Sequence, residues 1–320
     1  MPSGQAEAND EFVPDAELQR VLDDLRGPPR RIDAKYFYDA RGSVLFEQIT
    51  HLPEYYLTRC ELEILQTRGE EIVSTVKSGA AMIELGAASS DKVRPLLEHL
   101  ATPGVYVALD ISEAALERVV AEFDRAFPEL GLRPVQADFT APIDLDEIRD
   151  SPQRVLFYPG STIGNFDPHD AQAFLTRLRE AHLRPGDLLL LGVDLQKDPA
   201  VLDAAYNDAQ GVTAAFNKNV LRHLDARFGG DLDPEQFEHL AFYDPEKGCV
   251  EMHLRVREPH IAELGGDHFA FGLHETIHTE SSWKYTRHHL RALGEQAGFF
   301  ETGYWTDRRS WFGVWRFEVR

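Results

Sequence analysis

The segment IELGAASSDK, residues 83–92, joins a buried apolar run to a glycine turn and decides the fold. The apolar run, AAMIELG at residues 80–86, predicts a buried strand, and Gly86 stands where the backbone must turn tightly at its end. Residues 91–100 then carry the pattern of a helix. A buried strand, a glycine turn and a helix in this order are typical of a nucleotide-binding α/β unit.

The same alternation of strand and helix continues along the chain. Further apolar strand runs are VYVALDI, PVQADF, VLFYPGS and DLLLLGVDL, interspersed with helical stretches such as SEAALERVVAEFDRAF and HDAQAFLTRLREAHL. This pattern predicts a parallel sheet covered on both faces, which binds its ligands at the carboxyl ends of the strands. After a helix in YTRHHLRALGEQAG, the stretches FFETGYWT and WFGVWRFEV predict an antiparallel strand pair.

The remaining segments do not follow this alternation. We expect residues 1–30 to be loosely ordered apart from a short helix at about 16–25, and residues 31–78 to form helices, at about 42–50 and 59–77, that join a substrate domain. Residues 198–285 are expected as an inserted α+β unit, with helical segments at 200–226 and 234–241 followed by the alternating stretches CVEMHLRVRE and HFAFGLHETIHTESS. Residues 79–197 and 286–320 would then make up the core with the parallel sheet.

Charge and cysteine content exclude several classes of function. The net charge of −21 opposes binding to nucleic-acid phosphates and to anionic lipid, so we expect a small neutral or zwitterionic substrate and no nucleic-acid or membrane partner. The two cysteines, Cys60 and Cys249, form no C-x-x-C pair, and no apolar run reaches the roughly 20 residues that span a bilayer. The N-terminus is polar and acidic and lacks a signal-peptide pattern, so the chain is expected in the reducing cytoplasm, as a monomer.

Polar and acidic residues stand at the ends of three consecutive strands of the predicted sheet. Glu84 and Gly86 end the first, Asp110 ends the second about 24 residues after Gly86, and Asp138-Phe139 ends the third. A carboxylate at the place of Asp110 can bind the two hydroxyls of a ribose, and an acceptor beside an aromatic ring suits an adenine. The dinucleotide motif G-x-G-x-x-G is absent, and Ala88 stands where its second glycine is expected. The pattern therefore favours S-adenosylmethionine, which has no pyrophosphate, and a methyltransferase.

The loop YPGSTIGNF, residues 158–166, follows the fourth strand and is the first candidate for substrate contact. It lacks the Asn-Pro-Pro-aromatic motif of adenine-amino methyltransferases. Gly160, Ser161 and Gly164 make it polar and rich in accessible backbone, and the amide of Asn165 can donate to a carboxylate. Taken alone, the loop is equally compatible with a plain turn whose residues cap the following helix.

Five longer runs carry a resemblance to a family. FYDARGSVLFEQITHLPEYYLTRCE, FYPGSTIGNF, YNDAQGVTAAFNKNVL, VEMHL and TESSWKYT resemble, in order and spacing, the histidine-specific Nα-methyltransferases that form hercynine for ergothioneine biosynthesis. The resemblance covers about residues 33–320. It implies a class I methyltransferase core with a Rossmann-like sheet, and an α+β substrate-binding domain built from the N-terminal helices and the insertion. It further implies three successive methyl transfers from S-adenosylmethionine to the α-amino group of free L-histidine, giving N,N,N-trimethylhistidine (hercynine).

The resemblance also assigns roles to individual residues. Tyr38 would face the α-amino group as the catalytic residue, and Asn165 and Tyr206 would hold the substrate carboxylate. Glu280 and Ser282 would bond the two imidazole nitrogens, and since a serine hydroxyl both donates and accepts, either ring tautomer would fit. The other residues on the substrate side are Gly160, Tyr55, Phe216 and Met252, and those on the cofactor side are Gly86, Lys92, Asp110, Asp138 and Phe139. The sequence departs from the family at Ala88 and Ser281, neither of which removes a side-chain ligand.

Three other functions stay open at this point. The same scaffold could methylate another amino acid such as tryptophan, although Glu280 and Met252 suit an indole poorly. A non-catalytic amino-acid-binding protein would use the same residues without turnover. A zinc hydrolase is the third, because HETIH at residues 274–278 matches H-E-x-x-H. Its Thr and Ile residues favour a strand, on which the two histidines lie about 13 Å apart, so we expect no metal site.

Overall fold

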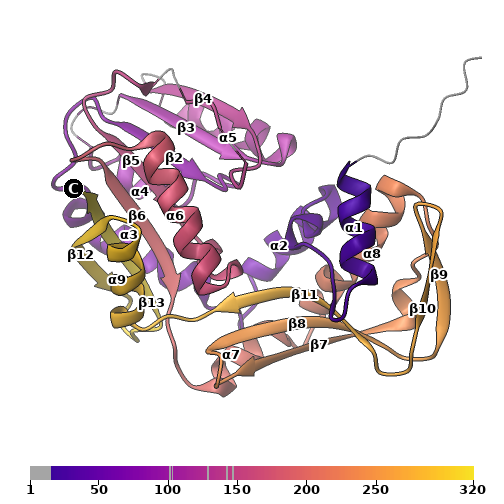
Figure 1. Ribbon diagram of the computed structural model, residues 1–320. Helices are drawn as coiled ribbons and strands as arrows, with labels where there is room; N and C mark the ends of the chain where they lie inside the picture. The colour runs from indigo at the N-terminus through magenta and orange to yellow at the C-terminus, as the bar shows by residue number, and fades with distance from the viewer. Residues whose placement is uncertain (1–15, 101, 103, 128–129, 142, 146–147) are drawn as a thin grey trace, which may run out of the picture.

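The computed structural model describes residues 16–320 except 101, 103, 128–129, 142 and 146–147. Its largest element is a seven-stranded sheet with the order β12-β13-β6-β5-β2-β3-β4 (Figure 1). The parallel strands are β2 (Ala81–Leu85), β3 (Val105–Asp110), β4 (Gly131–Gln136), β5 (Arg154–Tyr158) and β6 (Leu188–Asp194). The C-terminal hairpin of β12 (Phe299–Thr306) and β13 (Phe312–Val319) pairs with β6 in antiparallel orientation. The predicted α/β class is confirmed.

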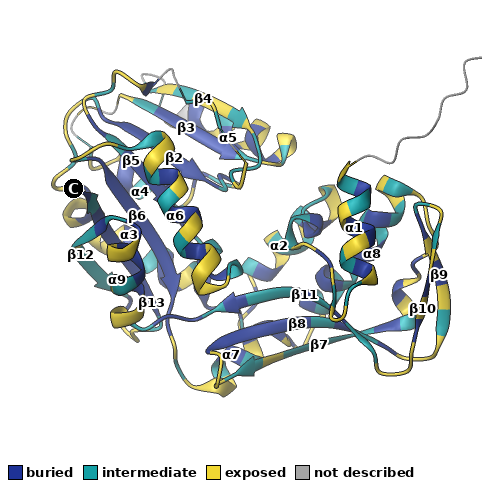
Figure 2. Ribbon diagram, in the orientation of Figure 1, coloured by how far each residue is buried: buried dark blue, intermediate teal, exposed yellow. Residues whose placement is uncertain are grey.

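Alternate residues of the central strands face the two layers of helices that cover this sheet. Met82 and Tyr106 face one layer, whereas their neighbours Ile83 and Val107 face the other. The first layer contains α3 (Leu57–Val73), α4 (Arg94–Leu97) and α5 (Glu113–Ala126), and the second contains α6 (Pro168–His182) and α9 (Arg287–Gln296). Figure 2 shows the central strands buried and the outer faces of the helices exposed, which is why the strands are continuous apolar runs. Among the described helices, none is long and apolar enough to cross a membrane.

A second unit is built around a smaller, four-stranded sheet with the order β1-β11-β8-β7. Its strands are β1 (Arg30–Arg31), β7 (Phe237–Asp244), β8 (Cys249–Val256) and β11 (Thr276–Trp283), and β9 (His260–Leu264) and β10 (Asp267–Phe271) form a separate hairpin. Its helical segments are α1 (Ala16–Arg26), η1 (Ala34–Phe37), α2 (Ala40–Thr50), α7 (Pro199–Tyr206), α8 (Val212–Phe228) and η4 (Pro234–Gln236). Because β1 pairs with β11 and α2 packs on α8, the N-terminal segment and the middle of the chain form this unit together (Figure 1).

One local expectation needs correction. The helical segment predicted at 234–241 is wrong, because residues 237–244 form β7 and pair with β8 along their whole length, which outweighs the helix propensity of their Glu, Leu and Ala. The helix expected at about 16–25 is present as α1, with Leu18, Leu22 and Leu25 buried. Residues 1–15 lie outside the described part of the chain.

Candidate active site

The turn after β2 leaves open space at the carboxyl edge of the large sheet. Gly86 has a φ of +78°, and its N–H donates to the Leu109 carbonyl at 2.8 Å. A Cβ at this position would meet nothing within 4 Å, so the backbone of the turn is open to a ligand. Glu84 is buried and accepts from the Tyr106 hydroxyl at 2.5 Å, and burial raises the pKa of its carboxyl to about 8. Glu84 is therefore engaged with the neighbouring strand beneath the turn.

Further cofactor candidates lie at the ends of two neighbouring strands. Asp110 is the last residue of β3, where burial raises the pKa of its carboxyl and the Ser112 N–H donates to it at 2.8 Å. Asp138 follows β4 by two residues, and its Oδ1 accepts a backbone N–H two residues further on at 2.8 Å. The ring of Phe139 lies 5.6 Å from that of Tyr158 at the end of β5. An open glycine turn, a carboxylate and an aromatic ring along one sheet edge fit a ribose and an adenine.

Lys92 is tied to the substrate loop by Glu61, which ends the run FYDARGSVLFEQITHLPEYYLTRCE but is not one of the predicted site residues. The Lys92 ammonium lies 2.8 Å from the carboxylate of Glu61, which is fully buried on α3. Both oxygens of this carboxylate accept the N–H of Gly160 at 3.0 Å. A Cβ on Gly192 in β6 would collide with the same carboxylate. A glycine inside an apolar strand indicates a close approach of this kind and was the available signal in the sequence.

The loop after β5 connects the large sheet to the smaller one. Gly160 and Ser161 both adopt left-handed backbone, with φ of +79° and +60°, and Ser161 Oγ accepts the Asp194 N–H at 2.9 Å. This conformation is strained for a serine, and such strain is concentrated at functional sites. The loop ends in the 3-10 turn η3 (Thr162–Asn165), where the Asn165 amide donates to the Glu280 carboxylate. Two predicted substrate residues thus meet across the two units.

Polar side chains occupy alternate positions along β11 and just beyond its end. Glu280, Ser282 and Lys284 have the spacing of two that places strand residues on one face. Met252 of β8 is the register partner of Glu280. Burial raises the pKa of the Glu280 carboxyl to about 7, although the positive charge of Lys284 and the hydrogen bond from Asn165 act in the opposite direction. The carboxylate is therefore held partly desolvated, ready to accept a hydrogen bond from a ligand.

Lys284 was not among the predicted residues, and it organises the hydroxyls at this site. Its buried ammonium donates to the Tyr206 hydroxyl at 2.9 Å and to Ser282 Oγ at 2.7 Å, and it pairs with Asp194 at 3.0 Å. The Tyr206 hydroxyl donates in turn to Ser282 Oγ at 2.8 Å. Two donors thus already point at Ser282, which limits its capacity to accept a third hydrogen bond. The spacing from Glu280 and Ser282 was the sequence signal for Lys284.

Aromatic rings from the N-terminal segment and from α8 pack together beside these polar groups. The centroid of the Tyr38 ring lies 5.8 Å from those of Phe46 and Phe216, and Phe46 lies 6.3 Å from Tyr55. Phe216 and Met252 are buried. Phe46 belongs to the aromatic-rich stretch that opens the chain's N-terminal helices, but nothing in the sequence distinguished it from its neighbours.

Tyr38 lies within electrostatic reach of Asp110, a cofactor candidate, and of Glu280, a substrate candidate. Burial raises the pKa of its hydroxyl, and so do the negative charges of Glu280 and Asp110. The pKa of Tyr55 is raised by burial first and then by Tyr206, Tyr38 and Glu280. Electrostatic coupling of this kind needs proximity, so these side chains share one site at the junction of the two units.

The HETIH segment does not form the helix that a zinc hydrolase requires. His274 has a φ of +62° in the turn before β11, and His278 lies within the strand, with Nε2 2.9 Å from Ser281 Oγ. Glu275 accepts the Gly272 N–H at 2.9 Å and the Arg30 Nε–H at 2.5 Å. The strand expected here is present only from Thr276 onward, and His274 and Glu275 lie before it, so the two histidines do not share one turn of a helix.

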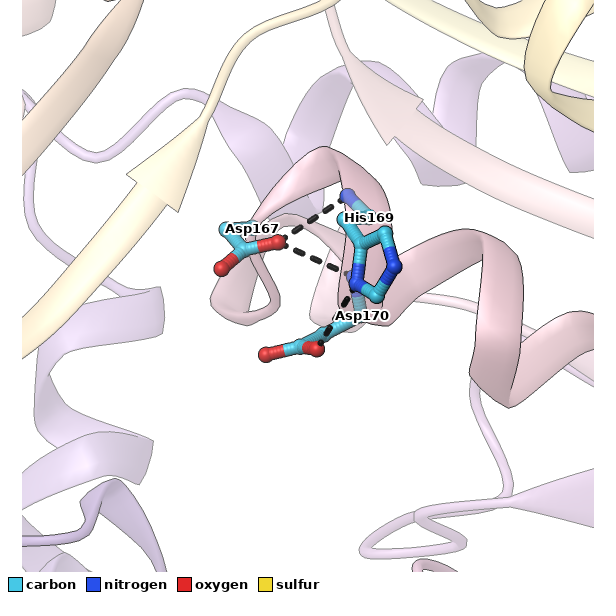
Figure 3. Close-up of side chains that lie close together, drawn as sticks. All are labelled: Asp167, His169 and Asp170. Carbon is cyan, nitrogen blue, oxygen red and sulfur yellow. Dashed lines mark hydrogen bonds and ion pairs between the residues drawn. The ribbon is translucent and has the colours of Figure 1, made fainter.

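A different trio of possible metal ligands lies at the start of α6. Within the described part of the chain, the one group of three or more with ligand atoms close enough for an ion is Asp167, His169 and Asp170, all of them exposed (Figure 3). Asp167 Oδ1 accepts the backbone N–H groups of His169 and Asp170, each at 2.9 Å. These contacts are those of a helix N-cap, which accounts for the cluster without a ligand.

Comparison with known proteins adds the family to this geometry. The family model described as "Histidine-specific methyltransferase, SAM-dependent" matches residues 17–319. The histidine N-alpha-methyltransferase of Mycolicibacterium smegmatis is 38% identical over 295 residues, which cover 91% of each chain, and that of Mycobacterium tuberculosis is 37% identical over 299 residues, which cover 92% of each. The L-tryptophan methyltransferase trpM of Psilocybe serbica is 28% identical, over 91% of this chain and 89% of its own. The present chain therefore belongs to the family of histidine-specific, S-adenosylmethionine-dependent methyltransferases.

Proposed function

We propose that this methyltransferase transfers methyl groups to the α-amino group of free L-histidine, in three successive rounds that yield hercynine. The position of Tyr38 supports the proposal most directly. Its hydroxyl responds to the charge of Glu280, on the substrate side, and to that of Asp110, on the cofactor side. A group within reach of both carboxylates is where a substrate amine would meet a methyl donor.

Glu280 and Asn165 would select the substrate at its two ends. The Glu280 carboxylate would accept an imidazole N–H, and a side chain without such a donor would leave this largely desolvated carboxylate with its bond from Asn165 alone. The Asn165 amide has two N–H groups, so one can keep its bond to Glu280 while the other donates to the substrate carboxylate. Tyr206 would reinforce the carboxylate contact beside the positive charge of Lys284. Met252 and Phe216 are buried next to these groups and would pack on the ring.

The residues at the edge of the large sheet would hold S-adenosylmethionine. Asp110 would bind the ribose hydroxyls, the open turn at Gly86 would admit the adjoining part of the ligand, and Asp138 and Phe139 would bind the adenine. Lys92 would contribute through its contact with Glu61, which fixes the loop at Gly160. When bound, the cofactor supplies an electrophilic methyl group on a sulfonium.

The protein's contribution to the reaction would be alignment and exclusion of water. An amine attacks in line only when it is neutral and correctly oriented, and holding two reactants in this geometry supplies a large part of the rate. Because the pKa of Tyr38 is raised, its hydroxyl stays protonated and its oxygen can accept an N–H of the amine, but it does not serve as the base. The amine proton would pass to water. After each round the amine must rotate and lose another proton, until no N–H is left.

A panel of free amino acids tests this proposal. The protein is incubated with S-adenosylmethionine and each of the twenty amino acids, and the products are read by mass spectrometry. We expect histidine alone to gain three methyl groups, and the Glu280→Ala variant to lose this selectivity. Preferential methylation of tryptophan would contradict the proposal, and so would tight cofactor binding without turnover of any amino acid.

A further inference from the structure

The ammonium of Lys284 has all three of its N–H groups engaged. Its partners are Asp194 at 3.0 Å, the Tyr206 hydroxyl at 2.9 Å and Ser282 Oγ at 2.7 Å, and its side chain is fully buried. An ammonium can only donate hydrogen bonds. It therefore uses one lone pair on the oxygen of Tyr206 and one on that of Ser282, so the protons of these two hydroxyls must point away from Lys284.

This arrangement fixes the hydrogen-bond polarity of Ser282. Its Oγ accepts from Lys284 at 2.7 Å and from the Tyr206 hydroxyl at 2.8 Å, which together use both of its lone pairs. Its own proton has no acceptor among the described residues. When a substrate carboxylate takes the proton of the Tyr206 hydroxyl instead, Lys284 still donates to Ser282 Oγ, and its positive charge favours a ligand atom that accepts the Ser282 proton. Ser282 is thus prepared to donate.

In its ionised form, which a bound N–H donor favours, Glu280 has the opposite polarity, because its carboxylate only accepts. It already receives one hydrogen bond from Asn165 and lies on the same face as Ser282, two residues away. A ligand that satisfies both side chains must offer one N–H and one bare nitrogen. A neutral imidazole does so in one of its two tautomers, whereas an imidazolium offers two N–H groups and no acceptor.

We propose that Lys284 is a positioning residue that makes Ser282 a hydrogen-bond donor and thereby restricts the site to the neutral imidazole ring, in a single tautomer. This inference rests on the proposed function, since it takes histidine as the substrate. Beyond that function, the site would select the protonation state of the imidazole ring, and Lys284 is the residue responsible. The positive charge of Lys284 acts in the same direction, because it repels an imidazolium.

The charges around Lys284 are compatible with this role. Among the described residues, the charged and titratable groups that interact electrostatically with Lys284 are Asp194, Lys197, Tyr206, Tyr243, Cys249 and Glu280. Asp194 lies against both lysines, at 2.5 Å from the Lys197 ammonium and 3.0 Å from that of Lys284, and it also accepts from the Tyr56 hydroxyl. Burial opposes the charge of Lys284, but Tyr206 and Asp194 outweigh it and raise the pKa of the ammonium. Lys284 therefore stays charged while a histidine ring titrates.

The test compares histidine with 2-fluorohistidine, whose ring stays neutral at mildly acidic pH because fluorine withdraws electron density. Affinities of both are measured by calorimetry from pH 5.5 to 8 with S-adenosylhomocysteine present. The ratio of the two affinities cancels the ionisation of the free protein. With an unperturbed ring pKa of ~6.5, we expect the wild-type affinity for histidine, relative to the analogue, to fall about tenfold between pH 8 and pH 5.5.

Two variants separate the contact with Ser282 from the charge cluster around Asp194. In Lys284→Met we expect the tenfold fall to shrink to less than about threefold, because Ser282 can then accept from an imidazolium. In Lys197→Met the fall should stay as in the wild type, because Lys197 contacts Asp194 and Tyr56 but neither pocket hydroxyl. Equal flattening in both variants would overturn the inference, as would an unchanged fall in Lys284→Met.

The wild-type protein alone gives a second test that does not depend on the folding of a variant. The ring of bound 15N-labelled histidine is observed by NMR at pH 6. One protonated and one bare nitrogen are expected, and two protonated nitrogens would overturn the inference. If histidine binds but the ratio of its affinity to that of 2-fluorohistidine does not change with pH, this inference is overturned and the proposed function stands. No histidine binding at any pH overturns the proposed function and this inference with it.

Discussion

Replacing Glu280 by glutamine is expected to stabilise the folded protein at pH 8. The pKa of this carboxyl is raised from 4.5 to about 7, chiefly by burial. Between these two values the folded state binds a proton that the unfolded state has lost, so the free energy of unfolding falls as pH rises through this window. At 1.36 kcal/mol per pKa unit, the ionised carboxylate costs about 3 kcal/mol above pH 7. Glutamine keeps an oxygen for Asn165 and carries no such cost.

The assay is thermal or urea unfolding of wild type and Glu280→Gln at pH 5 and pH 8, without ligands. We expect the variant to unfold about 5 °C higher at pH 8, and the difference to nearly disappear at pH 5. Glu258→Gln, at an exposed loop position, is the matched control and should change neither value. A variant that is less stable than wild type at pH 8, or a difference that is the same at both pH values, would refute the reasoning.

The remaining predictions concern the cofactor edge of the large sheet, the reacting amine and the contact of Glu61 with Lys92. Asp110→Asn should weaken cofactor binding by about tenfold to a hundredfold in calorimetry, because a charge-assisted hydrogen bond is lost. In steady-state kinetics, Tyr38→Phe should lower kcat by about tenfold to a hundredfold with little change in the KM for histidine, because the amine loses the group that aligns it. Glu61→Leu should lower the free energy of unfolding by about 3 kcal/mol in urea titrations, because the Lys92 ammonium loses its buried partner. An unchanged cofactor affinity, an unchanged kcat or an unchanged stability would count against the respective assignment.

The centre of the large sheet could be predicted because β2, β3, β5 and β6 are buried on both faces. Continuous apolar runs such as LLLLGVD in β6 predict buried strands, and the glycine turn at Gly86 marks the edge of the sheet where a ligand can bind. β7 was mistaken for a helix because its residues have helix-forming side chains, and its strand conformation depends on pairing with β8. Pairing between strands is a property of the tertiary structure that a local pattern does not contain.

The candidate site was predicted unevenly for a related reason. Residues that meet the ligands belong to motifs, so Glu280, Asn165 and Tyr38 could be named from the sequence. The groups that support them are buried ion pairs between distant segments, such as Glu61 with Lys92 and Asp194 with Lys284. Lysine and carboxylate residues are usually exposed, so nothing in a sequence indicates which of them are paired inside. Lys284 is the exception, because its spacing from Glu280 follows the strand period.

The most direct test of the account is to locate the transferred methyl group. The protein is supplied with S-adenosylmethionine labelled with 13C in its methyl group and with histidine labelled with 15N at the α-nitrogen, and the product is examined by NMR. We expect every labelled methyl carbon to be coupled to the α-nitrogen and the final product to carry three of them. Labelled methyl groups on a ring nitrogen, or none on histidine at all, would contradict it.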